Sequence, residues 1–282
     1  MKVLALLPAK NEERMVRWSI LSVINQVRRP DCFLLVDDES SDSTPEIMKE
    51  FAAGFDWIHY FRVPGRRERN VGAGVARALI LGVRFGEAAC LRDWDLLIKV
   101  DADTVLERGY IAKIVERFER DPKLGIASGF PVGEPPNPDH ARGMGMSIRR
   151  DVWVEARLKP ILGWDSYLVF KARMLGWRVR SFSDIKMFLM RPTSVSEGSL
   201  HRGKFKQGFT SGFLGYPPFL LIGRAARNAL SYGRPGVFVA MVAGYLSARI
   251  NYPEPVDPEV KEWLRMYEVG RFRSFASRIL GP

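Results

Sequence analysis

Cysteine is scarce in this chain of 282 residues, which contains only Cys32 and Cys90. Two cysteines set in apolar or mixed segments give neither a disulfide framework nor the ligand spacing of a metal site. The apolar start at residues 1–8 is too short for a secretory signal and runs directly into the charged segment 10–14, so we interpret it as a first strand. We therefore expect a protein of the reducing cytoplasm.

Long apolar runs are also missing. A membrane-spanning helix needs about 20 apolar residues, and the uncharged stretches 207–223 and 235–248 are shorter than that. Arginines flank both stretches, a pattern typical of elements that lie at the surface of an anionic membrane. A helical hairpin packed on the rest of the protein, or on a second copy, explains the pattern equally well. The flanking residues are Arg224, Arg227, Arg234 and Arg249.

The chain is basic, with 43 Lys and Arg against 32 Asp and Glu and a formal net charge of +11. A positive charge favours polyanionic partners, which include nucleic acid, acidic lipid and phosphorylated substrates. The sequence has no zinc finger, RNP-like segment or other recognisable nucleic-acid module. We therefore expect a phosphorylated substrate or an anionic membrane surface, and no nucleic acid.

Apolar strands and amphipathic helices alternate along the first half of the chain, which indicates an α/β protein. Strands are expected at 2–7, 33–36, 57–63 and 96–100, and helices at 14–26, after 44, up to 89 and over 110–121. This order predicts a mostly parallel sheet flanked by helices, with functional loops at the carboxyl ends of the strands. Further strands are expected at 124–130 and 143–148, and helices at 151–158 and 163–175.

Two carboxylates one residue apart, Asp101 and Asp103, follow the buried strand 96–100. Ligands of α/β sheets bind at this end of the strands. Mg²⁺ and Mn²⁺ take oxygen ligands, and Mg²⁺ is commonly held by one or two carboxylates together with substrate phosphates. Both acids could share one metal-bound diphosphate, or one could hold the metal while the other contacts a sugar. Aspartate is also a common turn residue and such pairs often occur by chance, so the pair alone favours a surface turn over a metal site.

Five short segments follow one another in a characteristic order: 8–13 (PAKNEE), 36–44 (VDDESSDST), 70–72 (NVG) with Arg77, 100–104 (VDADT) and 163–165 (GWD). Together they resemble the inverting GT-A glycosyltransferases of family 2, which include dolichyl-phosphate-sugar synthases. The resemblance covers approximately residues 1–185. It implies a GT-A fold and a nucleotide-diphosphate-sugar donor, with UDP or GDP as the nucleotide.

The resemblance also implies roles for individual residues. Asp38 would recognise the base, while Asp37 would shape the loop around it. Asp101 and Asp103 would face the metal-bound diphosphate and the donor sugar, with Asp103 as the direct ligand of Mg²⁺ or Mn²⁺. The residues expected to line or contact the nucleotide are Pro8, Ala9, Asn11, Glu12, Asp38, Arg69, Asn70, Arg77 and Asp101.

Asp165 matches the acid that serves as catalytic base in inverting members, although Trp164 stands where the family commonly has glutamate. Inversion needs a carboxylate on the face of the sugar opposite the leaving nucleotide, where it can deprotonate the acceptor hydroxyl. The metal would stabilise the leaving diphosphate. Some GT-A enzymes complete the metal shell with a late histidine, so His201 is a candidate third ligand. Its alternative is a structural histidine, and Arg202 and Lys204 are candidate diphosphate contacts.

We therefore expect a GT-A catalytic domain at 1–200 and a basic, partly apolar helical extension at 201–282. The expected function is metal-dependent, inverting transfer of a sugar to an acceptor hydroxyl on a glycan or a lipid-linked molecule, in the cytoplasm and at the cytoplasmic face of a membrane. A sugar-nucleotide pyrophosphorylase shares the α/β pattern, but such enzymes usually carry a Gly-rich loop after the first strand. A basic membrane-binding protein with a relic site is the non-enzymatic alternative.

Overall fold

The computed structural model describes residues 1–65, 73–134, 138–191, 199–254 and 256–280. The chain forms two compact units, Met1–Met190 and Arg191–Pro282. The boundary predicted from the sequence lies between residues 200 and 201. We describe the two units separately.

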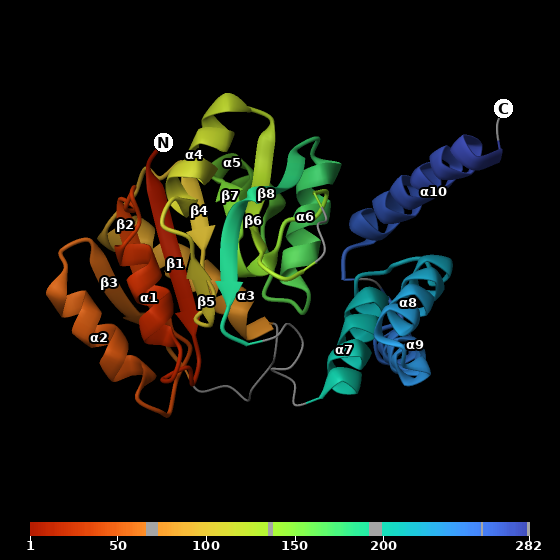
Figure 1. Ribbon diagram of the computed structural model, residues 1–282, viewed down its shortest axis with the longest axis horizontal. Coiled ribbons are helices and arrows are strands. Elements are labelled where there is room, and N and C mark those ends of the chain that lie inside the picture. The colour runs from red at the N-terminus through yellow and green to blue at the C-terminus, as the bar shows by residue number, and fades with distance from the viewer. Residues whose placement is uncertain (66–72, 135–137, 192–198, 255, 281–282) are drawn as a thin grey trace. The chain divides into compact units, whose positions relative to one another are not determined.

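The first unit begins with the predicted alternation of strands and helices (Figure 1). The elements are β1 (Val3–Ala9), α1 (Val16–Ile24), β2 (Cys32–Asp37), α2 (Thr44–Gly54), β3 (Ile58–Arg62), α3 (Ala73–Ala89) and β4 (Leu96–Lys99). They continue with β5 (Thr104–Leu106), α4 (Tyr110–Arg120), β6 (Leu124–Pro131), the 3₁₀ turn η1 (Gly143–Gly145), β7 (Ser147–Arg149), α5 (Arg150–Ala156), α6 (Trp164–Met174) and β8 (Arg178–Leu189).

One mixed sheet joins all the strands in the order β3-β2-β1-β4-β7-β6-β8-β5. The pairs β3–β2, β2–β1, β1–β4 and β6–β8 are parallel, whereas β7 pairs antiparallel with β4 and β6, and β5 with β8. The α/β prediction is confirmed. The segment 143–148, predicted to be one strand, instead forms η1 followed by the short strand β7.

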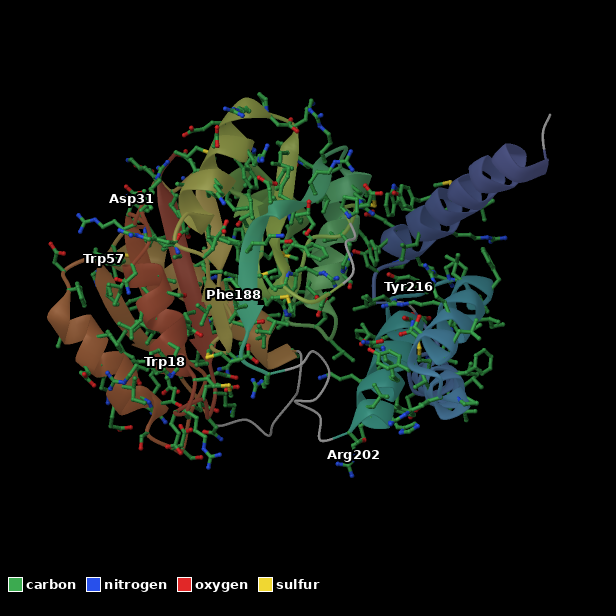
Figure 2. The ribbon with its side chains drawn as sticks, viewed as in Figure 1. Trp18, Asp31, Trp57, Phe188, Arg202 and Tyr216 are labelled. Carbon is green, nitrogen blue, oxygen red and sulfur yellow. A yellow bond between two sulfur atoms is a disulfide. The ribbon has the colours of Figure 1, made fainter. Side chains whose placement is uncertain are left out.

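Both faces of β1 are buried, which explains its unbroken apolar sequence. Val3, Ala5 and Leu7 belong to the core that α1, α2 and α4 share with the sheet. The alternate residues face α3, where a β-carbon at Gly82 would lie 2.8 Å from Leu6. Helix α3 therefore lies unusually close to the sheet. Trp18 on the outer side of α1 is 59% exposed (Figure 2).

A buried tyrosine connects three elements near the centre of the sheet. The Tyr110 hydroxyl donates to the Gly145 carbonyl (2.7 Å) and accepts from the Gly129 N–H (2.8 Å). Burial raises the pKa of Tyr110, so the phenol stays protonated and keeps both bonds. These bonds connect α4 to η1 and to β6.

The two cysteines form a disulfide between Cys32, at the start of β2, and Cys90, which follows α3. The interpretation that they form no disulfide is therefore wrong. The two cysteines have a sequence separation of 58, so no local pattern indicates the pairing, which the packing of α3 on the sheet creates. The cytoplasmic location stays a prediction, and free cysteines no longer support it.

The second unit consists of α7 (Leu200–Phe213), α8 (Pro218–Tyr232), α9 (Pro235–Asn251) and α10 (Pro258–Leu280). Helices α7 and α9 touch through their glycines, since a β-carbon at Gly208 would overlap the Met241 carbonyl and one at Gly244 would overlap the Phe205 carbonyl. Leu221, Val237 and Tyr245 belong to a small separate core. None of the helices in the described part of the chain is long and apolar enough to cross a membrane.

Candidate functional site

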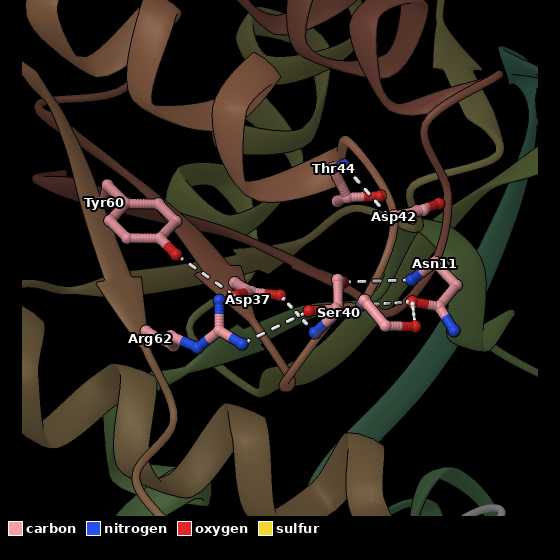
Figure 3. A network of polar contacts seen from close by, with 8 residues as sticks. Asn11, Asp37, Ser40, Asp42, Thr44, Tyr60 and Arg62 are labelled. Atoms are coloured by element: carbon pink, nitrogen blue, oxygen red, sulfur yellow. Dashed lines mark hydrogen bonds and ion pairs between the residues drawn. The ribbon is translucent and has the colours of Figure 1, made fainter.

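Two loops are tied together beyond the carboxyl ends of β1 and β2 (Figure 3). Asn11 adopts a left-handed backbone (φ 55°), which turns the first loop toward the second. Its N–H donates to Ser40 Oγ (3.0 Å), and its Oδ1 accepts from the Ser41 N–H (2.8 Å). The Glu12 N–H donates to Thr44 Oγ1 (2.8 Å). Hydrogen bonds therefore join segments 8–13 and 36–44, which resemble the family motifs, into one continuous surface.

Asp37 holds the second loop in place, as predicted. Its side chain is fully buried. The carboxylate accepts from the Ser40 N–H (2.8 Å) and the Tyr60 hydroxyl (3.1 Å), and it forms an ion pair with Arg62 (3.0 Å). A buried charge whose hydrogen bonds are satisfied in this way stabilises the loop.

Asp38 is half-buried at the end of β2, and its backbone N–H donates to the Ala9 carbonyl (2.8 Å). Burial raises the pKa of its carboxyl above the ordinary value, although nearby Lys10 and Arg77 act in the opposite direction. A β-carbon at Gly74 would lie 3.1 Å from Asp38 Oδ2, so the first turn of α3 packs directly on this carboxylate. A half-buried acid between two cations can accept hydrogen bonds from a ligand.

Asp101 follows β4 and forms an ion pair with Lys99, whose side chain is only 4% exposed. Lys99 Nζ also donates to the Gly143 carbonyl (3.0 Å) and lies 5.4 Å from the centre of the Trp164 ring. A buried ammonium needs such partners. Trp164, which replaces the usual glutamate of the family, thus contributes an aromatic face to Lys99 instead of a carboxylate.

The structure brings Asp165 close to the acid pair. A β-carbon at Gly143 would lie 3.1 Å from Asp165 Oδ2, and the Gly143 carbonyl binds Lys99. Burial raises the pKa of Asp101, Lys99 opposes this shift, and the charges of Asp103 and Asp165 raise the pKa further. Asp165, which is far from Asp101 in the sequence, therefore lies close enough to Asp101 for the two charges to repel each other.

The donor set fits a hard divalent cation. Asp101 and Asp103 are both partly exposed and offer carboxylate oxygens, and the repulsion between them is relieved when a cation binds. In the part of the chain that the structure describes, these acids do not form a ready cluster of three protein ligands. Two carboxylates suffice where substrate phosphates supply further oxygens.

The remaining predicted residues lie in different places. Pro8 and Ala9 end β1, and Arg77 on α3 donates to the Pro64 carbonyl. Arg69 and Asn70 lie outside the described residues. His201 and Arg202 occupy the exposed first turn of α7 in the second unit, where Ser199 accepts the Arg202 N–H (Figure 2). The role of His201 as a metal ligand stays a prediction.

Lys204 is engaged within the second unit. Only 4% of the residue is exposed, and its Nζ donates to Asn228 Oδ1 (2.7 Å) and Gln207 Oε1 (3.3 Å). The ammonium also lies over the Tyr232 ring. These contacts account for the burial of the Lys204 ammonium group and give this residue a structural role in the second unit.

Lys99 and Gly143 are the site residues that sequence reasoning missed. The sequence does mark Lys99, because it is a charged residue inside the apolar run that leads to Asp101. No sequence pattern marks Gly143, since its position depends on how the chain returns from β6 to β7.

Residues 5–177, more than half of the chain, match the family model described as glycosyl transferase family 2. The poly-beta-1,6-N-acetyl-D-glucosamine synthase of Staphylococcus epidermidis is 23% identical over 199 residues, which cover 63% of this chain and 45% of that protein. The probable glycosyltransferase YdaM of Bacillus subtilis is 31% identical over 130 residues, which cover 45% of this chain and 29% of that protein. The chain thus spans less than half the length of these curated relatives.

Solved structures share the fold. The mannosyltransferase PcManGT from Pyrobaculum calidifontis, in complex with GDP-Man and Mn²⁺, matches with a TM-score of 0.61 at 17% identity, covering 94% of this chain and 83% of that one. Residues 1–349 of S. aureus TarS, in complex with UDP, match with a TM-score of 0.57 at 14% identity, covering 94% and 92%. The predicted GT-A fold is confirmed. The family model and the ordered motifs together show that the chain belongs to glycosyl transferase family 2.

Proposed function

We propose that this protein is an inverting glycosyltransferase that moves a sugar from a nucleotide-diphosphate donor to an acceptor hydroxyl. The observation that supports this most is the proximity of Asp103 and Asp165 to Asp101, which forms an ion pair with Lys99. The bonded loops after β1 and β2 lie at the same carboxyl edge of the sheet as the acid pair. A donor that spans this edge reaches from Asp38 to the acids.

The nucleotide would bind to the surface formed by the two loops. Asp38 is the group we assign to the base, because its neighbour Asp37 is occupied by Ser40, Tyr60 and Arg62. UDP-sugars and GDP-sugars are the proposed donors, in line with the GDP-Man and UDP found with the structural neighbours. Pro8, Ala9 and Asn11 would line the same pocket.

Asp165 would be the catalytic base. Its carboxylate takes the proton of the acceptor hydroxyl while the hydroxyl oxygen forms the new bond to the anomeric carbon and the bond to the nucleotide diphosphate breaks. Attack from the face opposite the leaving group inverts the anomeric carbon. The Ser166 N–H donates to Asp165 Oδ1 (2.8 Å), which orients the carboxylate at the start of α6.

A divalent cation, Mg²⁺ or Mn²⁺, would be held by Asp103 and Asp101. When bound, the ion supplies positive charge that stabilises the leaving diphosphate. Lys99 holds Asp101 in place from the protein side. The complex of PcManGT with Mn²⁺ supports the use of a divalent ion in this fold.

The first test is a thermal-shift screen of nucleotide sugars with and without Mg²⁺ or Mn²⁺. We expect one nucleotide class to raise the unfolding temperature, and to do so more strongly with a metal, since a ligand present at 100 times its Kd stabilises by about 2.7 kcal/mol. Failure of every nucleotide sugar under every metal condition would overturn the transferase proposal. A pyrophosphorylase would instead release pyrophosphate when given a nucleoside triphosphate and a sugar phosphate.

The second test separates the base from the binding residues. Asp165→Asn should keep donor affinity within a few-fold and lower the transfer rate by about 10²–10⁴, the contribution typical of a general base. Asp151→Asn is the matched control, because Asp151 also lies in the first turn of a helix, α5. Equal losses of donor binding and of transfer in Asp165→Asn would remove the base assignment.

The acceptor is proposed to be a glycan or a lipid-linked molecule. Helices α8 and α9 expose large apolar side chains, among them Leu230 (83%) and Ile250 (78%). Helix α8 also carries the exposed Arg224 and Arg227, which suits a surface that meets anionic lipid. Peripheral contact with a membrane would bring a lipid-linked acceptor to the enzyme.

A further inference from the structure

A second group of potential ligands lies at the opposite edge of the sheet from the acids. Cys32 begins β2, His59 lies near the start of β3, and Cys90 follows the last turn of α3. Since β2 and β3 run parallel, their first residues share one edge, whereas Asp37 and Arg62 share the other. One ligand atom from each of the three side chains lies within 4.8 Å of the other two.

We propose that, once the disulfide is reduced, Cys32, Cys90 and His59 bind a soft divalent cation such as Zn²⁺. Thiolate sulfur and imidazole nitrogen are the ligands that Zn²⁺ prefers. Three protein ligands leave the fourth tetrahedral position to water. Cys32 is 1% exposed, but His59 and Cys90 are only half-buried and give the ion and its water a route to the site. This site is independent of the proposed transferase function.

The backbone already has suitable dimensions. The Cα atoms of the two cysteines are 6.2 Å apart. Two sulfurs bound to one tetrahedral Zn²⁺ at 2.3 Å lie about 3.8 Å from each other. Rotation about the Cα–Cβ bonds can open the sulfur pair to that separation, and His59 lies within reach of both sulfurs.

The disulfide and the metal exclude each other, because a ligating sulfur must be a thiolate. A trialkylphosphine and one water convert the disulfide into two thiols and the phosphine oxide. The divalent ion then replaces the two thiol protons, which pass to the buffer. The site is therefore open to metal only in the reduced protein.

Either link fastens the carboxyl end of α3 to the sheet. The other end of this helix packs on Asp38 through Gly74, and its middle lies against β1 and β2 at Gly82. A metal in the reduced protein would replace the covalent link that reduction removes. Reduced protein should therefore regain thermal stability when Zn²⁺ is added.

The test uses Co²⁺ as an optical substitute for Zn²⁺. The full chain is reduced with a phosphine under anaerobic conditions, freed of the reagent and titrated with Co²⁺. We expect a thiolate-to-cobalt charge-transfer band that saturates at one ion per chain and disappears on addition of Zn²⁺. Oxidised protein should give no such band. Ions bound by Asp101 and Asp103 have oxygen ligands, so they do not produce this band.

Variants identify the ligands. Cys90→Ser and His59→Ala should each weaken Co²⁺ binding at least about 10-fold, since even the loss of a second-shell partner costs that much. His140→Ala is the matched control, a partly buried histidine outside the cluster, and should bind like the wild type. His59→Ala keeps both cysteines and their disulfide, so it isolates the imidazole from any effect of Cys90 on folding. Absence of the band in reduced wild-type protein, or an unchanged affinity in His59→Ala, would overturn the proposal.

Discussion

Adjacent aspartates can have opposite roles when their surroundings differ. Asp37 is buried with its hydrogen bonds satisfied by the loop, whereas burial raises the pKa of Asp38 and the nearby cations only partly compensate. Folding thus makes the Asp38 carboxyl harder to ionise than it is in the unfolded chain. The charge that Asp38 carries at neutral pH therefore lowers the stability of the folded protein.

Asp38→Asn should therefore make the free protein more stable at pH 7 while weakening nucleotide binding. The pKa of the Asp38 carboxyl is higher in the folded protein than in the unfolded chain, where it is near 3.8. The carboxyl therefore stabilises the folded protein most at a pH below the unfolded pKa, and this stabilisation is lost as the pH rises through the folded pKa. The gain in unfolding temperature should be present at pH 7 and should shrink toward pH 4. Thermal unfolding at both pH values and calorimetric titration with nucleotide measure the two effects.

Asp42→Asn is the control with the opposite sign. Burial, the largest single influence, pushes the pKa of Asp42 up, but the hydrogen bonds that its carboxylate accepts from Thr44 and Glu13 together bring it below the ordinary value. Its stabilising effect is present above the unfolded pKa and is lost as the pH falls through the folded pKa, so this variant should be less stable at pH 7. A fall in the unfolding temperature of Asp38→Asn at pH 7 would contradict our account.

At the scale of the element, the sequence predicts the strands that are buried along their whole length. Strands β1, β2 and β4 are buried on both faces and read as apolar runs. The long strand β8 was not predicted, although Val179, Ile185 and Met187 are its buried residues. Exposed charges and an inward-facing Ser181 interrupt its pattern, and its register with β6 is irregular. With three residues, β5 is too short to give a pattern.

The residues of the candidate site also fall into two groups, those that the sequence indicates and those that it does not. Asp38, Asp101 and Asp165 were found because each follows a strand or begins a helix within a family motif. Lys99, Gly143 and the Cys32–Cys90 link depend on contacts between distant segments. Local patterns carry no information on such contacts, since they are set by how whole elements pack.

The contact between α7 and α9 leads to a prediction at the scale of the element. Gly208→Ala should destabilise the second unit, because the added β-carbon would overlap the backbone carbonyl of Met241, which no side-chain rotation can move away. Overpacking costs typically about 1–3 kcal/mol, more than the gain of about 1 kcal/mol in helix propensity. Urea unfolding followed by circular dichroism measures the change.

Gly223→Ala provides the matched control. Gly223 is also a helical glycine of the second unit, but a β-carbon there would meet nothing within 4 Å. This variant should gain up to about 1 kcal/mol from helix propensity alone. If Gly208→Ala unfolds at the same urea concentration as Gly223→Ala, the two helices do not depend on backbone contact.

At the scale of the whole molecule, the second unit carries most of the net positive charge and exposes several large apolar side chains. Residues 191–282 contain 13 Lys and Arg against 6 Asp and Glu, which is +7 of the total of +11. The same unit exposes Leu230 and Ile250 on α8 and α9, which are too short or too polar to cross a membrane. A basic unit with exposed apolar side chains is suited to bind at the interface of an anionic membrane.

We expect the full chain to float with anionic vesicles and not with neutral ones, and to be released by high salt, since lipid attraction amounts to about 1 kcal/mol per basic residue and is screened within about 10 Å at 0.1 M salt. Leu230→Asp combined with Ile250→Asp should weaken vesicle binding at least about 10-fold, because burying each apolar side chain contributes about 1.5–3 kcal/mol. Val27→Asp, which changes a side chain 72% exposed in the first unit, should bind as the wild type does. If the double variant binds vesicles as well as the wild type and Val27→Asp do, the prediction is wrong. Charge alone would then attract the chain, and α8 and α9 would stay outside the lipid.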